Sequence, residues 1–223
     1  RLTDVTGVQT CALPICPGTG YIEQWACAAG RLPVLGVDEA GRGCLAGPVV
    51  AAAVLLPDPY AIEHLDDSKM LSAETRDRLY AVVQARARAI GVGVVEAGAI
   101  DRTNILAATL EAMRIAVEQA TAACDGPVGL VVVDGNQPIR GLTVPQKTWA
   151  KADHLSWNCA AASIVAKVTR DRMMAALDTE YPGYGFAIHK GYGTRAHLAA
   201  LAALGPCPQH RMSFAPLKGR TAP

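Results

Sequence analysis

Residues 34–43 of the chain read VLGVDEAGRG, a short apolar run joined to two adjacent carboxylates and two nearby glycines. The apolar run predicts a β-strand that ends where the glycines begin. Two charges beside a buried strand cost free energy unless they are paired or bind a metal ion. Since adjacent strand residues point to opposite faces, Asp38 and Glu39 converge only if the backbone bends, which Gly41 and Gly43 allow.

Apolar runs and helical periodicity along the rest of the chain predict an α/β domain. Three further strands are expected, at Val49 to Leu56, Ile90 to Val95 and Leu130 to Val133. Four helices are expected, from Ser72 to about Ala89, from Ile105 to Ala122, from Asn158 to Leu177 and from Thr194 to Leu204. This order favours a three-layer fold, in which helices flank a central mixed sheet, with a helical C-terminal part.

The composition suits a single domain with a sizeable core, because 51% of the 223 residues are hydrophobic. The formal net charge is only +1, which argues against a nucleic-acid partner. The charge is uneven, however, with 10 Lys and Arg against 16 Asp and Glu in residues 1–139, and 11 against 4 in residues 140–223. An acidic part beside a basic part suits a metal-dependent enzyme acting on a polyanion, and a chance bias is the alternative.

The sequence predicts neither a membrane segment nor an export signal. The longest apolar stretch, Leu45 to Leu56, is too short for a bilayer. The seven cysteines are odd in number and lack C-x-x-C spacing, so we expect free thiols and a cytoplasmic location. Residues 1–16 show no periodicity and are interpreted as a non-native or disordered leader, with a native extension as the alternative.

Two more aspartates stand where they could join the first pair. Asp134 ends the apolar strand at residues 130–133, and Asp153 comes just before the Ala-rich helix. Carboxylates that meet at one edge of a sheet suit Mg²⁺ or Mn²⁺, which prefer oxygen ligands. Each residue also has a simpler interpretation, since Asp134 before Gly135 is typical of a turn and Asp153 of a helix cap.

Seven short motifs follow one another along the chain. They are Asp38-Glu39-Ala40-Gly41-Arg42-Gly43, Gly47-Pro48, Asp67-Ser68-Lys69, Val133-Asp134-Gly135, Lys151-Ala152-Asp153, the segment from Ala161 to Asp171, and His189-Lys190-Gly191-Tyr192-Gly193-Thr194. Together they closely resemble the ribonuclease HII family, over roughly Leu32 to Leu217. Each motif alone is weak, but seven in this order are specific.

The resemblance implies a ribonuclease-H-like fold with four catalytic, metal-binding carboxylates: Asp38, Glu39, Asp134 and Asp153. The implied cofactor is Mn²⁺ or Mg²⁺, with two ions per site during catalysis. The implied catalytic domain spans residues 32–217, between an N-terminal segment at 17–31 and a tail at 218–223.

The resemblance also implies substrate contacts. Gly41, Arg42 and Gly43 would follow the backbone around a ribonucleotide. Tyr192 would pack near its sugar and help to sense the 2′-OH, the group that distinguishes RNA from DNA. Without the resemblance, Tyr192 is more typical of an ordinary boundary tyrosine in a Gly-Tyr-Gly turn.

Several polar side chains are then expected to contact the substrate. Lys69, Ser163 and Lys167 are the first candidates, and Ser163 and Lys167 lie four residues apart on one helix face. Further candidate phosphate contacts are Lys151, Arg170 and Lys190, each equally typical of a solvated surface charge. Met70 and Met212 depart from the family's pattern, which has Lys and Arg at these places.

The implied function is that of a metal-dependent endoribonuclease, a hydrolase that cleaves the RNA strand of RNA–DNA hybrids. It would also nick duplex DNA on the 5′ side of an embedded ribonucleotide, leaving 5′-phosphate and 3′-hydroxyl ends. The implied setting is ribonucleotide excision in DNA repair and replication, by a monomer with no membrane partner.

Three other functions fit parts of the sequence. A nuclease with paired histidines would use the 2′-OH as its nucleophile, without metal, and give a cyclic phosphate. A non-catalytic module would bind hybrids in a salt-sensitive way without turnover. Ribonuclease HIII shares much of the fold but normally carries an extra N-terminal domain.

Overall fold

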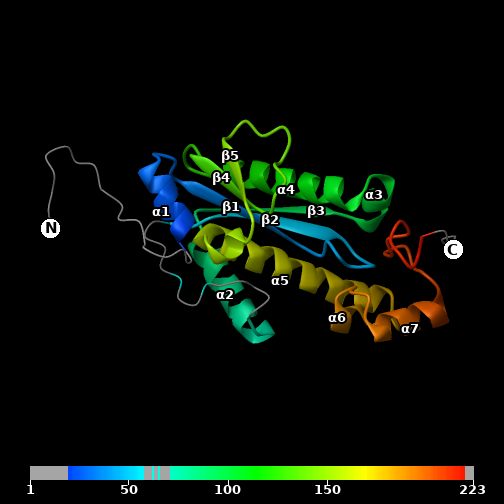
Figure 1. The fold of residues 1–223 in the computed structure, drawn as a ribbon. Coiled ribbons are helices and arrows are strands. Elements are labelled where there is room, and N and C mark those ends of the chain that lie inside the picture. Colours follow the sequence, from blue (N-terminus) through cyan, green and yellow to red (C-terminus); the bar gives the residue numbers. More distant parts are fainter. Residues whose placement is uncertain (1–19, 58–61, 63–64, 66–70, 219–223) are drawn as a thin grey trace, which may run out of the picture.

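The centre of the computed structural model is a mixed five-stranded sheet with strand order β3-β2-β1-β4-β5 (Figure 1). The structure describes residues 20–57, 62, 65 and 71–218. The strands are β1 (Val34–Ala40), β2 (Val49–Leu55), β3 (Ala89–Val95), β4 (Leu130–Asp134) and β5 (Gln146–Trp149). The middle strand, β1, pairs antiparallel with β2 and parallel with β4.

Helices cover both faces of this sheet (Figure 1). They are α1 (Tyr21–Ala28), α2 (Ala73–Arg86), α3 (Ala97–Arg102), α4 (Ile105–Ala122), the 3₁₀ helix η1 (Ala152–His154), α5 (Trp157–Glu180), α6 (Phe186–His189) and α7 (Arg195–Leu204). α4 packs on one face, α5 packs on the other with α2 against it, and α6 and α7 follow the far end of α5. The predicted three-layer α/β fold with a helical C-terminal part is confirmed.

The helix starts that the sequence indicated are present as side-chain caps. Ser72, Asn104 and Thr194 each accept a hydrogen bond from the backbone N–H three residues later. The short elements α1, α3, α6 and β5 were not predicted. β5 has no apolar run because it is the edge of the sheet, where its polar side chains reach the surface.

The residues of β1 alternate strictly between the two layers. Leu35 and Val37 belong to the core cluster under α4. Val34 packs on the opposite side with Cys159 of α5. Gly36 lies against the backbone of α5, which approaches so closely that an added Cβ would overlap it. This alternation decides where the carboxylates that follow on β1 point.

The predicted apolar stripe of α4 is only partly right. Met113 and Val117 are buried as expected, but Leu106 is exposed. The helix turns alanines toward β3, because Gly91 and Gly93 let the backbones meet. An added Cβ at Gly93 would overlap the carbonyl oxygen of Ala112.

No helix within the described ranges is long and apolar enough to span a membrane. The thiols partly match expectation. Within the described ranges, four cysteines are free: Cys44, Cys124, Cys159 and Cys207. The expectation is wrong for Cys27, which is disulfide-bonded.

The contact between α4 and β3 can be tested with Gly93→Ala. We expect this change to lower the free energy of unfolding by about 2 kcal/mol, because the added methyl group forces α4 away from the sheet. Gly126→Ala is the control, since an added Cβ there meets no atom within 4 Å, and its effect should stay within about 0.5 kcal/mol. Urea unfolding measures both, and equal stability of the two variants would contradict the packing described.

Candidate active site

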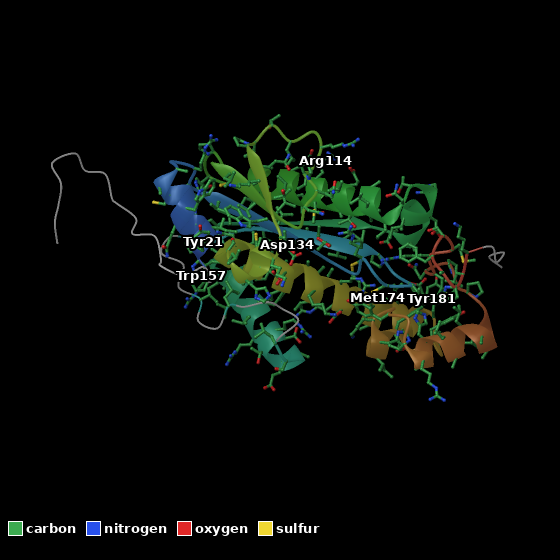
Figure 2. All side chains as sticks on the ribbon, viewed as in Figure 1. Tyr21, Arg114, Asp134, Trp157, Met174 and Tyr181 are labelled. Carbon is green, nitrogen blue, oxygen red and sulfur yellow. The ribbon has the colours of Figure 1, made fainter. Side chains whose placement is uncertain are left out.

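Three carboxylates from different elements meet beside the sheet. One oxygen each of Asp38, Asp134 and Asp153 lies within 4.8 Å of the others. Because Val37 pairs with Val133 in the parallel β1–β4 ladder, the aspartate that follows each valine lies on the same face of the sheet. Asp153 comes from η1, just before the helix α5 that covers this face. Figure 2 labels Asp134 at the end of β4, near α5.

Glu39 lies outside this group of three. β1 continues in regular register with β2 as far as Ala40, so the backbone does not bend at the two carboxylates. Glu39 lines a small hollow together with Met113 of α4 and with Asp134, so it lies at the border of the group and not within it. One oxygen of Glu39 is 3.6 Å from a guanidinium nitrogen of Arg42.

Asp38 is the most constrained member of the group. Its Oδ1 accepts a hydrogen bond of 2.6 Å from the N–H of Glu39, whereas its buried Oδ2 has no hydrogen-bond partner among the described residues. Burial, with the charges of Glu39, Asp134 and Asp153, raises the pKa of Asp38 well above its usual range.

These observations fit a divalent cation. A bound cation would offset the repulsion between the carboxylates and give the orphaned oxygen of Asp38 a partner. Asp134 is already oriented, since its Oδ1 accepts a hydrogen bond of 2.7 Å from the N–H of Ala152, one residue before Asp153. The simple interpretation of Asp153 as the cap of α5 is wrong, because Ser156 caps that helix.

Two buried arginines hold the glycine-rich loop that follows β1. Arg211 donates to the carbonyl oxygens of Gly41, Arg42 and Gly47 at 2.8 to 3.0 Å. Arg170 donates to three more carbonyl oxygens, those of Ala46, Pro48 and Lys190. Burial lowers the pKa of Arg211 to about 10, so the guanidinium remains charged at neutral pH.

These two arginines correct one expectation from the sequence and add one residue to those that shape the site. Arg170 is not a phosphate contact, because its side chain is buried and faces carbonyl oxygens. The sequence did carry a signal that Arg170 is buried. Arg170 lies four residues from both Ala166 and Met174, so it shares a helix face with two buried residues. The role of Arg211 was missed, because its partners lie about 165 residues earlier in the chain.

Gly41 requires glycine for two reasons. Its φ of +91° lies in the left-handed region, and an added Cβ would overlap the guanidinium of Arg170. Gly43 has open space around its Cα, and half of the Arg42 side chain is exposed. The exposed side of the loop therefore lies at Arg42 and Gly43.

The other candidate substrate residues differ in their exposure and in their hydrogen-bond partners. Lys167 lies with its Nζ 5.9 Å from the ring centre of Tyr192, which is 44% exposed, and forms an ion pair with Asp171. Ser163 is buried, and its hydroxyl donates to the carbonyl oxygen of Ala160. Lys69 and Met70 lie outside the described residues.

Three of the five histidines form a buried group next to Tyr192. His197 donates through Nδ1 to the carbonyl oxygen of Tyr192 at 2.9 Å, and its Nε2 lies 3.1 Å from the Nε2 of His210. His189 stacks on His197 with ring centres 4.2 Å apart. Burial lowers the pKa of His210 to about 4, so it does not suit acid–base catalysis at neutral pH.

Met212 contacts helix α3 through its backbone. Its N–H donates to Asp101 at 2.8 Å, and the N–H of Ser213 donates to the same carboxylate. The contact does not depend on the side chain, so the replacement of a usual Arg by Met leaves this anchor in place.

Comparisons with known proteins identify the family of this chain. The family model described as Ribonuclease HII matches residues 35–217. Ribonuclease HII of Geobacter metallireducens is 55% identical over 190 residues, which are 85% of this chain and 87% of that protein.

Two solved structures share the fold. Ribonuclease H2 from Pyrococcus horikoshii OT3 has a TM-score of 0.65 and 27% identity, covering 82% of this chain and 94% of that chain. Bst-RNase HIII in complex with Mn²⁺ has a TM-score of 0.64, covering 84% of this chain and 68% of that chain; its 19% identity shows the fold alone.

The resemblance found in the seven motifs and the ribonuclease-H-like fold are thus both confirmed. The matched relatives are enzymes, and this chain covers most of their length. The chain belongs to the ribonuclease HII family and is a hydrolase, a nuclease of the ribonuclease H type.

Proposed function

We propose that this protein is a metal-dependent endonuclease that cleaves the RNA strand of RNA–DNA hybrids and nicks duplex DNA on the 5′ side of an embedded ribonucleotide. The products would be 5′-phosphate and 3′-hydroxyl ends, and the reaction would serve ribonucleotide removal in DNA repair and replication. The observation that carries the proposal is the group of Asp38, Asp134 and Asp153, in which two side chains are buried and one oxygen is orphaned, beside a loop that exposes Arg42 and Gly43.

Asp38, Asp134 and Asp153 would hold the divalent cations, and Glu39 would join from the end of β1. When bound there, divalent cations would supply the chemistry that activates a water and stabilises the charge developing on the scissile phosphate. The protein keeps the carboxylates in place before any ion arrives, since Asp134 and Asp38 each accept a backbone hydrogen bond. Mn²⁺ is the first ion to test, because Bst-RNase HIII was solved with it.

The loop at Gly41, Arg42 and Gly43 would follow the substrate backbone. The carbonyl oxygens of Gly41 and Arg42 accept from Arg211 on the inner side, so the loop presents its outer side to a phosphate. The half-exposed guanidinium of Arg42 is close enough to Glu39 to link phosphate binding with the carboxylates.

Tyr192 would detect the ribonucleotide. Its exposed ring suits packing on a sugar, and its backbone is anchored by His197. Lys167, next to the ring, would bind an adjacent phosphate. Lys69 would bind a further phosphate, and Ser163 would reach the substrate only after its hydroxyl leaves the carbonyl oxygen of Ala160.

The proposal predicts nicking of duplex DNA that contains one ribonucleotide in the presence of Mn²⁺ or Mg²⁺. Chelator should abolish the reaction, and Asp134→Asn should lower kcat by about 10³-fold or more, because the amide is a weaker cation ligand. Gel analysis of end-labelled strands measures the rate and the ends. Metal-independent cleavage that gives a cyclic phosphate would support the histidine nuclease instead, and binding without turnover would support a hybrid-binding module.

Tyr192→Ala should lower kcat/KM on the single-ribonucleotide duplex by about 100-fold, because the sugar loses its packing partner. Tyr192→Phe keeps the ring and tests the hydroxyl separately. Cleavage rates over a range of substrate concentrations give kcat/KM, and Mn²⁺ titration should give unchanged affinity. Wild-type rates in both variants would remove Tyr192 from the substrate site.

Asp38→Asn should stabilise the metal-free protein and abolish Mn²⁺ binding. A carboxyl whose pKa is raised on folding binds its proton more tightly in the folded chain, so the wild type loses stability as pH rises above the ordinary carboxyl range. The neutral amide avoids this loss and can still accept from Glu39. Thermal unfolding in chelator should show a Tm gain of a few degrees that grows with pH, and a lower Tm at every pH would contradict the prediction.

A further inference from the structure

Helix α1, which precedes the residues matched by the family model, contributes a buried carboxylate to the start of α5. Glu23 is 3% exposed. Its Oε1 accepts from the hydroxyl of Ser156 at 2.5 Å, from the N–H of Asn158 at 3.2 Å and from the side-chain amide of Asn158 at 2.9 Å. Three donors from the α5 N-terminus therefore converge on one oxygen of α1.

The backbone of α1 holds the same junction. The N–H groups of Gly20 and Ile22 both donate to the carbonyl oxygen of Leu155, at 3.1 Å each. Leu155 directly follows η1, the 3₁₀ helix that carries Asp153. Gly20, just before α1, lies so close to the ring of Trp157 at the start of α5 that an added Cβ would overlap it; Figure 2 labels Trp157 and the neighbouring Tyr21.

Apolar packing adds a third connection. Ile22 and Ala26 share a buried cluster with Ala152 of η1 and Cys159 of α5. Residues on both sides of Asp153 are thus in contact with α1. On its other side, η1 is tied to the active site by the hydrogen bond from the N–H of Ala152 to Asp134.

We propose that Glu23 is a positioning residue of the metal centre. By holding Ser156 and Asn158 it fixes the η1–α5 junction and with it the carboxylate of Asp153. The inference rests on the proposed function, since it assumes that Asp153 binds the cation.

The contacts of Glu23 also say which replacement should preserve its role. All three hydrogen bonds end on Oε1, whereas Oε2 is buried without a hydrogen-bond partner in the described part of the chain. A glutamine can present one oxygen to the same three donors. An alanine removes the acceptor, so the three buried donors lose their hydrogen-bond partner.

The test is calorimetric titration of the full chain with Mn²⁺ alone, together with Tm in chelator. Glu23→Ala should raise the Kd for Mn²⁺ by about tenfold, a loss within the range seen for residues that orient metal ligands. Glu23→Gln should stay within about twofold of wild type, since it keeps the acceptor. In cleavage assays, Glu23→Ala should need more Mn²⁺ for half-maximal rate and recover most of kcat at saturation.

Ser72→Ala is the matched control, because it removes the cap of another helix, α2, without touching η1. It should lower Tm and leave the Kd for Mn²⁺ unchanged, which separates positioning from general destabilisation. If Glu23→Ala does not fold, Glu23→Asp keeps the charge, shortens the reach and should weaken Mn²⁺ binding in the same direction.

Two outcomes separate this inference from the proposed function. Wild-type Mn²⁺ affinity in folded Glu23→Ala or Glu23→Asp, with Asp134→Asn unable to bind, would overturn the role of Glu23 and leave the metal centre intact. Wild-type Mn²⁺ affinity in Asp134→Asn would overturn the metal centre itself.

Discussion

The parallel pairing of β1 with β4 places two aspartates side by side, and the rest of the active site is arranged around that pair. Val37 lies opposite Val133, so Asp38 and Asp134 follow on the face that α5 covers. A slip of one residue in either strand would turn one aspartate to the α4 face. Gly36 opposes such a slip in β1, because any side chain brought to its place would overlap the backbone of α5.

Two buried guanidinium groups give the loop after β1 a defined shape. Arg170 and Arg211 satisfy backbone carbonyl oxygens at Gly41, Arg42, Ala46, Gly47 and Pro48. Unsatisfied, these buried carbonyl groups would each cost free energy. The arginines come from α5 and from the segment after α7, so the helical C-terminal part completes the loop beside the carboxylates. The acidic and basic parts of the sequence therefore meet at one site.

The fold was largely predictable because its main elements have strong local signals. Buried strands appear as apolar runs, and Ser72, Asn104 and Thr194 mark helix starts. The short elements were missed because tertiary contacts stabilise them. α1 has no capping side chain and depends on its contacts with η1 and α5. The apolar stripe of α4 was partly mispredicted because its contact face depends on glycines of another element. Glycines on β3 let the two backbones approach closely, so alanines of α4 make the contact, and the periodicity of α4 alone does not show this.

By itself the sequence determined the order of the elements, the family resemblance and the identity of Asp38, Asp134 and Asp153 as residues that could meet. Motifs and periodicity act over a few residues, so they can be read without coordinates. Only the tertiary structure decided that Glu39 stands outside the group of three aspartates, that Arg170 holds a loop instead of a phosphate, and that Glu23 supports the turn carrying Asp153. The reason is physical: strand register, close backbone approach and buried polar networks join residues that lie about a hundred positions apart or more, and no local pattern specifies those partners.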